Sequence, residues 1–92
     1  MKINVKFGPN FKEVFNAEVK PLELENGAVF RDLLEKLCDS PKRRMKLFGL
    51  TDSLLPQVMV SKNGRFIVHL KWLETDLAEG DQVNIFNLFG GG

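Results

Sequence analysis

The sequence predicts an α+β fold in which one main helix packs on one face of a mixed sheet of four or five strands. Apolar and polar residues alternate near both ends of the chain, and one strongly amphipathic stretch lies between them. An Asn63-Gly64 pair between two strand-like segments adds a hairpin. Because the helical stretch separates two groups of strands, the last strand can pair parallel with the first.

Length and composition fit a single domain spanning residues 1–92. The 92 residues are 43% hydrophobic and include eight Phe, enough for one modest core. A net charge of +1 gives no general attraction to nucleic acid or to a membrane. Cys38 is the only cysteine, which excludes an internal disulfide and a cysteine-rich metal site. With no apolar run long enough for a membrane span, and no signal-peptide core, we expect a cytoplasmic protein without a bound metal or cofactor.

The first part of the chain predicts an antiparallel hairpin. Residues 2–7 alternate with Ile3, Val5 and Phe7 on the buried face, and residues 17–24 form a second strand. Pro21 in that strand predicts a bulge or a position at the sheet edge, because proline cannot donate a hydrogen bond to the ladder. The short connection 11–16 could form one helical turn over an edge of the core.

Residues 28–38 predict the main helix. Its apolar stripe consists of Phe30, Leu33, Leu34, Leu37 and Cys38. A second, short helix over 42–48 follows from Ser40 as N-cap, Pro41 as first helical residue and Gly49 as terminator.

The last part of the chain predicts two or three further strands. A strand near Gln57 enters the Asn63-Gly64 turn, and its return strand places Phe66, Val68, Leu70 and Trp72 on one face and Ile67, His69 and Lys71 on the other. We take His69 to lie on the wet face. After a polar turn at 77–81, a strand over 82–86 has Val83 and Ile85 inward. This order of elements is that of a β-grasp, the ubiquitin-like fold.

Four segments, in this order, resemble the MoaD/ThiS family of sulfur carrier proteins. They are Val29-Phe30-Arg31-Asp32-Leu33-Leu34, Val60-Ser61-Lys62-Asn63-Gly64-Arg65, Leu77-Ala78-Glu79-Gly80-Asp81-Gln82-Val83-Asn84-Ile85-Phe86 and the terminal Gly91-Gly92. The resemblance covers essentially the whole chain. Residues 39–56 add a segment that the shorter ThiS-like carriers lack, which favours a MoaD-like member, similar to the small subunit of molybdopterin synthase.

The resemblance implies a chemistry centred on the carboxylate of Gly92. In the family, an adenylating enzyme related to ubiquitin-activating enzymes (MoeB/ThiF type) uses ATP and magnesium to activate this carboxylate. A persulfide sulfur then replaces AMP, and the resulting thiocarboxylate donates sulfur inside a second enzyme, such as the large subunit of molybdopterin synthase or another sulfur acceptor. The chain itself would therefore be no enzyme, and it would bind neither nucleic acid nor membrane.

The C-terminal tail, residues 87–92, departs from the family pattern. The family usually has two prolines and a small aliphatic residue before its glycines, whereas this chain has Asn87-Leu88-Phe89 and then Gly90-Gly91-Gly92. Without prolines to hold it extended, we expect a flexible tail. The predicted partner-binding residues are Phe86, Leu88, Phe89, Gly90 and Gly91. Phe86 could be exposed for docking or could close the end of the core.

Other functions remain open from the sequence alone. Gly92 could be joined to lysines of target proteins, as in ubiquitin, or the carrier could serve thiamine, cysteine or tRNA thiolation. A plain β-grasp interaction module with an idle tail is a third possibility. Cys38 is expected to be a buried packing thiol, and the basic run Lys42, Arg43, Arg44 and Lys46 is a solvated helix face or a site for an acidic partner or phosphate.

Overall fold

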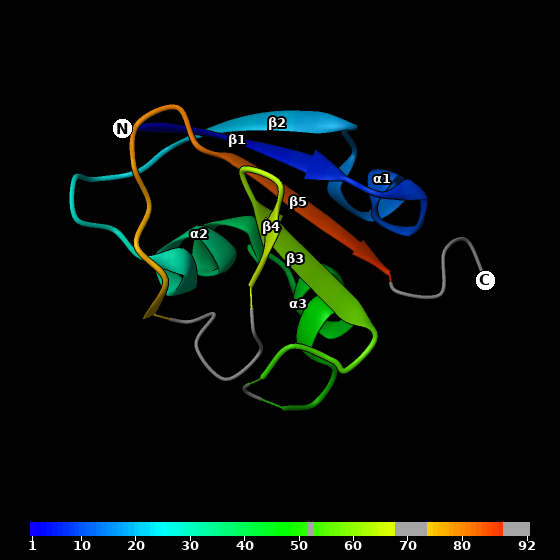
Figure 1. Cartoon of the computed structure of the whole chain (residues 1–92). Helices are drawn as coiled ribbons and strands as arrows, with labels where there is room; N and C mark the ends of the chain where they lie inside the picture. Colours follow the sequence, from blue (N-terminus) through cyan, green and yellow to red (C-terminus); the bar gives the residue numbers. More distant parts are fainter. Residues whose placement is uncertain (52, 68–73, 88–92) are drawn as a thin grey trace.

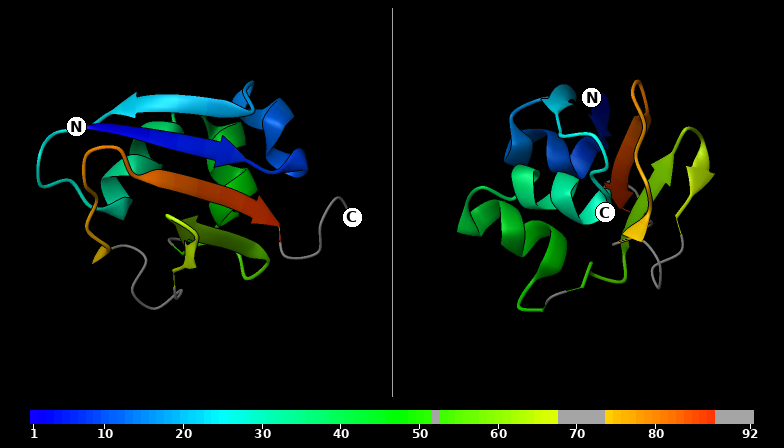
Figure 2. Two further views of the ribbon diagram at one scale, coloured as in Figure 1. Left: turned by 45° about the horizontal axis from the view of Figure 1, so that its top comes forward. Right: turned by 90° about the vertical axis from the view of Figure 1, so that its left-hand side faces the viewer.

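A computed structural model describes residues 1–51, 53–67 and 74–87 of the chain (Figure 1). Within these residues, five strands form one mixed sheet in the order β2-β1-β5-β3-β4. Three helices lie on one side of this sheet (Figure 2). In chain order the elements are β1 (Lys2–Phe7), α1 (Pro9–Phe15), β2 (Val19–Glu23), α2 (Phe30–Leu37), α3 (Pro41–Phe48), β3 (Val58–Lys62), β4 (Arg65–Phe66) and β5 (Gln82–Asn87).

The predicted hairpin of β1 and β2 is confirmed. Its antiparallel register runs without interruption from Lys6 opposite Val19 to Lys2 opposite Glu23. The strand therefore has no bulge, and Pro21 is accommodated because β2 lies at the edge of the sheet.

Helix α1 is longer than the single turn that the sequence predicts. Pro9 begins the helix, where its missing N–H costs nothing, and Asn16 ends it with a φ of 58°. Phe11 and Phe15 are both buried, and the Phe15 ring stacks on that of Phe7 with 4.5 Å between centroids. This aromatic contact holds α1 against the end of β1.

The two later helices form as predicted. In α2 the stripe Phe30, Leu33, Leu34 and Leu37 is buried, and the Asp32 carboxylate accepts a 2.8 Å hydrogen bond from the Val29 N–H before the helix. Cys38 is partly buried just after α2. In α3 the Ser40 hydroxyl accepts from the Arg43 N–H at 3.3 Å, and Gly49 ends the helix with a φ of 62°.

The β3–β4 hairpin is confirmed, but the predicted facing of its return strand is wrong. Asn63 and Gly64 both have positive φ, 52° and 84°, as a type I′ turn requires. Ser61 is opposite Phe66 in the register, and the Phe66 side chain is 66% exposed. Ile67, expected on the wet side, instead packs against the core. The remainder of the predicted strand, including His69 and Trp72, lies outside the described residues.

Strand β5 runs through the centre of the sheet. It pairs parallel with β1 and antiparallel with β3, which confirms the predicted crossover. Val83 and Ile85 are fully buried, as expected, and the strand continues through Asn87, one residue beyond its predicted end. The core lies between the helices and the sheet face that carries these two side chains.

The described residues contain neither a candidate membrane span nor a candidate metal cluster. None of the helices there is long and apolar enough to cross a membrane. The same residues bring together no group of three or more His, Cys, Asp or Glu side chains that could hold a metal ion.

Candidate functional site

The predicted site lies at the end of β5, where the C-terminal tail begins. Leu88, Phe89, Gly90, Gly91 and Gly92 lie outside the described residues. Phe86 is described, and it lies on the face of the sheet that points away from the helices, called here the outer face, since its neighbours Ile85 and Val83 alternate onto the buried face. Because β5 is hydrogen-bonded on both sides, the chain leaves the sheet from a fixed point.

Phe86 belongs to an apolar patch rather than to the core. Its ring lies 6.0 Å from that of Phe66, tilted by 57°, and Met59 is directly opposite it on β3. We call Met59, Phe66 and Phe86 the outer patch. Phe86 itself is half-buried, so it neither stands free in solvent nor closes the core. The outer patch joins three strands into one partly exposed apolar surface beside the end of β5.

A small hollow adjoins the outer patch at the end of the strand. It has a volume of about 190 Å³ and is lined by Lys6, Phe7, Gly8, Asn84, Ile85 and Phe86. Gly8 makes this close packing possible, because a Cβ at residue 8 would lie only 2.8 Å from the Phe86 Cβ. The Gly8 N–H also donates to the Ile85 carbonyl at 2.8 Å. The backbone beside Phe86 is thereby held on both sides.

The polar groups next to the outer patch are mostly uncharged. The Asn84 side-chain amide donates to the Ser61 hydroxyl at 3.2 Å, and the Gln82 side-chain amide donates to the Asn84 side-chain oxygen at 3.5 Å. Lys2 and Lys6, on β1, are the charged side chains that the described strands β1, β3 and β5 present on the outer face. A partner surface with apolar side chains and a carboxylate would complement this arrangement.

A polar network sets the position of the hairpin that carries Phe66. The Asp81 carboxylate accepts 2.8 Å hydrogen bonds from the Asn63 amide and from the Ala78 N–H. The Asn63 side-chain oxygen accepts from the Gln82 N–H, also at 2.8 Å. Asp81 is buried, and each of its two carboxylate oxygens accepts one of these bonds. The network fastens the β3–β4 turn to the start of β5, so that Phe66 and Phe86 have a defined relative position.

Sequence patterns alone missed Phe66, Met59, Lys6 and Gly8 as members of the site. The turn itself could have placed Phe66, because in a two-residue hairpin the residues directly flanking the turn pair, and so do the next two outward. Phe66 must then share the face of Ser61, which is opposite to the face of the core residue Val60. Alternation along the return strand shows that Phe66 and Ile67 lie on opposite faces, but it does not show which of the two faces is buried.

Cys38 is a packing thiol rather than a reactive group. Burial raises the pKa of the Cys38 thiol to about 11, and the positive charge of nearby Arg44 offsets that rise only in part. The side chain therefore stays a neutral thiol at physiological pH, when it is a poor nucleophile. A sulfur-relay role for Cys38 has no support in its surroundings.

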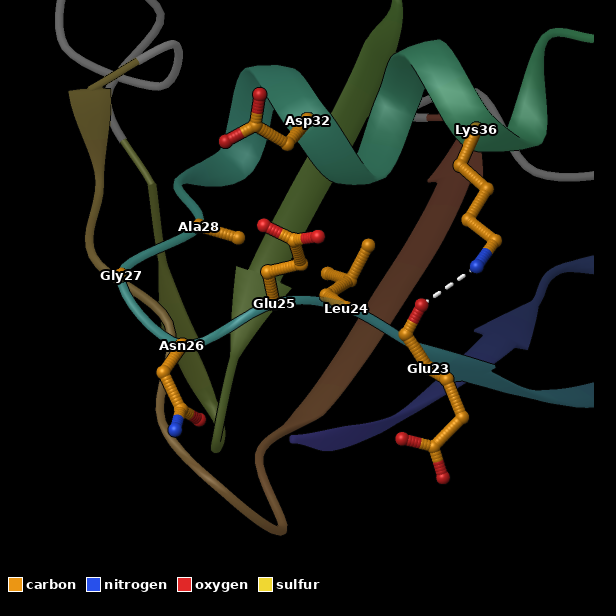
Figure 3. Close-up of a pocket in the computed structure, with 8 residues that line it drawn as sticks. All are labelled: Glu23, Leu24, Glu25, Asn26, Gly27, Ala28, Asp32 and Lys36. Atoms are coloured by element: carbon orange, nitrogen blue, oxygen red, sulfur yellow. Dashed lines mark hydrogen bonds between the residues drawn. The ribbon is translucent and has the colours of Figure 1, made fainter.

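A larger hollow of about 430 Å³ lies between the end of β2 and α2 (Figure 3). Acidic side chains from both elements line this hollow, but the hydrogen bonds made there stabilise the fold itself. Asp32 caps α2, and Lys36 donates to the Glu23 carbonyl at 2.5 Å. In Figure 1 the loop that joins β2 to α2, which lines this hollow, lies at the other end of the sheet from the end of β5. It is therefore no part of the predicted site.

Known proteins resemble this chain over nearly all of its length. The model of the ThiS family matches residues 11–92. Small archaeal modifier protein 3 of Haloferax volcanii is 31% identical over 98 residues, covering 100% of both chains. The crystal structure of SAMP1 from the same organism superposes with a TM-score of 0.84 at 22% identity, covering 100% of each chain.

A second similar structure carries a different description. It is a putative molybdopterin converting factor, subunit 1, from Pyrococcus furiosus, with a TM-score of 0.74, 25% identity and coverage of 95% of this chain and 97% of the other. The solved structures confirm the predicted β-grasp fold. The match of the family model and the identity to the modifier protein together show that the chain belongs to the ThiS family, whose members are small ubiquitin-like carrier and modifier proteins.

Proposed function

We propose that this chain is a sulfur carrier whose Gly92 carboxylate is activated and converted to a thiocarboxylate. The observation that carries the proposal is the Gly91-Gly92 sequence of a ThiS-family chain, with Gly92 five residues after Asn87, the last residue of β5. Glycine has no Cβ, so such an end can enter a channel too narrow for other residues. At roughly 3.3 to 3.6 Å per extended residue, five residues reach at most about 18 Å beyond the sheet.

The chemistry requires no acid or base from this chain. An adenylating enzyme of the MoeB/ThiF type, using ATP and magnesium, joins the Gly92 carboxylate to AMP and releases pyrophosphate. The terminal sulfur of a persulfide attacks the carbonyl carbon and AMP leaves. A thiol then reduces the acyl disulfide, which leaves the thiocarboxylate on Gly92 and a disulfide on the donor. Adenylation is needed because a free carboxylate has no good leaving group.

The outer patch is the surface by which we propose that partner enzymes hold the carrier. Partly exposed aromatic residues at the centre of a surface are typical anchors of protein interfaces. The outer patch lies on the sheet face next to the end of β5, so docking there would deliver Leu88, Phe89, Gly90 and Gly91 to the partner together with Gly92. Lys6 would pair with a carboxylate of the partner.

We further propose molybdopterin biosynthesis as the pathway and the cytoplasm as the location. The resemblance to the described molybdopterin converting factor subunit supports a large synthase-like subunit as acceptor. Residues 39–56, which include α3, are also the segment expected of a MoaD-like member.

Protein modification through Gly92 is the second candidate. A specific observation favours it, since the 31% identical relative is named a modifier protein. Activation by adenylation is common to both functions. They diverge at the nucleophile, which is sulfur in one case and the amine of a lysine in the other.

Intact mass spectrometry tests the leading proposal. The chain is incubated with an adenylating enzyme of the MoeB/ThiF type, ATP, magnesium and a persulfide donor. We expect a gain equal to the replacement of one oxygen by sulfur, located at Gly92. A chain lacking Gly91 and Gly92 should keep its fold and show no gain in mass.

An unchanged mass in the full chain contradicts the sulfur-carrier function, and Gly-Gly remnants on lysines of other proteins would instead support modification. Full function of the truncated chain would favour a plain interaction module.

A further inference from the structure

A second group of exposed apolar side chains lies on the helical side of the molecule. Met45 is 49% exposed and Leu50 is 91% exposed. Both line a hollow of about 370 Å³ along α3 and the turn after it, together with Pro41, Arg44, Gly49 and Thr51. Contiguous exposed apolar groups around a hollow are a feature of interaction sites. Leu50 in particular keeps almost its entire side chain in water.

The turn after α3 holds Leu50 outward. Gly49, with a φ of 62°, donates its N–H to the Met45 carbonyl at 2.9 Å, and the Thr51 N–H donates to the Phe48 carbonyl at 3.2 Å. The Thr51 hydroxyl lies 2.9 Å from the same carbonyl oxygen. Hydrogen bonds on both sides of Leu50 therefore fix its exposure, although the nearby Leu54 is buried.

Two lysines flank this apolar group. Lys42, Met45 and Lys46 share one face of α3, because they are spaced at i, i+3 and i+4. Both lysines are exposed, and neither ammonium group pairs with a carboxylate among the described residues. Arg43, by contrast, serves the fold, since its guanidinium contacts Asp39 at 2.9 Å and donates to the Val14 carbonyl at 3.0 Å. The Arg44 guanidinium lies over the Phe48 ring, 4.8 Å from its centre. The basic run is thus divided between two arginines that contact the fold and two outward lysines.

We propose that Lys42, Met45, Lys46 and Leu50, called here the α3 surface, dock an acidic protein segment. One large apolar side chain of that segment would enter the hollow between Met45 and Leu50. Its carboxylates would lie beside Lys42 and Lys46. Charge complementarity favours this occupant, because the α3 surface presents cations around an apolar centre. Nucleic acid is less suited to it, because the residues of the α3 surface include no aromatic ring on which a base could stack.

This docking goes beyond the proposed sulfur-carrier function. The helices lie on the side of the sheet opposite to the outer face (Figure 2). The α3 surface and the outer patch therefore do not overlap, and one partner could hold the carrier while another acts on Gly92. Docking at the α3 surface does not depend on the chemistry of the chain end.

The test is an NMR titration of the isotope-labelled full chain. The probe is a capped hexapeptide with a leucine–phenylalanine pair between two aspartate–glutamate pairs. We expect saturable amide shifts centred on Met45 and Leu50. The double variant Lys42→Glu/Lys46→Glu should bind about tenfold more weakly, since two favourable charge pairs become repulsive. Leu50→Ser should also weaken binding. The matched control Val19→Ser, which removes a 51% exposed apolar side chain on β2, away from the α3 surface, should bind like the original chain.

Further variants and probes separate the proposal from its rivals. A chain lacking Gly91 and Gly92 should bind the peptide unchanged, which distinguishes this test from that of the sulfur-carrier function. Equal binding of a peptide with lysines in place of its acidic residues would overturn the proposal. Amide shifts centred on Phe66 and Phe86, or no saturable shift at millimolar peptide, would also overturn it. Tighter binding of single-stranded oligothymidylate would point to nucleic acid instead, and concentration-dependent self-association through Leu50 without peptide would point to a second copy of this chain; either result would overturn the proposal.

Discussion

Gly8 and Phe86 approach so closely that a Cβ on residue 8 would lie 2.8 Å from the Phe86 Cβ and 3.3 Å from its Cα. The contact joins the end of β1 to the strand that leads into the C-terminal tail. Since the Phe86 backbone is hydrogen-bonded within the sheet, it cannot move aside without cost. The close approach therefore links a loop glycine to the geometry of the candidate site.

Gly8→Ala should destabilise the protein by about 1 to 3 kcal/mol, the usual range for overpacking. Its backbone φ of −70° is permitted to alanine, so the loss would come from the contact and not from backbone strain. The measurement is urea unfolding together with NMR shifts of the Phe66 and Phe86 rings. Gly27→Ala is the control, because residue 27 has a φ of 91° with nothing within 4 Å, and it should lower stability without moving those rings.

Asp81→Ala should destabilise the fold more than the loss of an exposed carboxylate does. It leaves the Asn63 amide and the Ala78 N–H without their acceptor, and a hydrogen bond to a charged group contributes about 1.5 to 3 kcal/mol to stability. Asp39→Ala, which removes a 59% exposed partner of Arg43, should cost less than about 1 kcal/mol. Urea midpoints compare the two variants. Equal losses would mean that the network at Asp81 contributes no more than a surface ion pair.

Phe66→Ser should impair activation of Gly92 while leaving the fold nearly intact. The side chain is 66% exposed, so little core packing is lost, but the outer patch loses one of its two rings. We expect pyrophosphate release by the adenylating enzyme to fall about tenfold at subsaturating carrier, as for loss of an interface anchor of about 1.4 kcal/mol. Leu50→Ser, which removes a 91% exposed apolar side chain on the helical side of the molecule, provides the control. Undiminished activation in Phe66→Ser would remove the outer patch from the docking surface.

Alkylation of Cys38 should be slow in the folded protein. Burial raises the thiol pKa from 9.0 to about 11, so the thiolate fraction at pH 8 falls about a hundredfold. Because the folded state holds this proton more tightly than the unfolded state, Cys38 should make stability fall as pH rises from about 9 to 11. Iodoacetamide kinetics test the first effect. Urea unfolding of Cys38→Ser, compared with the original chain across that pH range, tests the second.

The sequence by itself determined the order of the elements and most of the core. Ile3, Val5, Val83 and Ile85 are buried as the alternation predicts, and the α2 stripe is buried as its helical spacing predicts. These patterns are local, because they reflect the period of a strand or a helix. The Gly91-Gly92 end and the resemblance to the MoaD/ThiS family likewise need no coordinates.

Only the tertiary structure decided which side chains meet on the two surfaces. Phe66 and Phe86 are twenty residues apart in the chain and come together because β3 lies between β4 and β5. Alternation along one strand leaves the phase of that strand undetermined, and the register of the hairpin fixed it for Phe66. Leu50 is exposed because the hydrogen bonds around Gly49 and Thr51 turn it outward, and hydrophobicity alone would have placed it inside. Contacts between distant segments depend on register and turn geometry, which residue patterns within one segment do not contain.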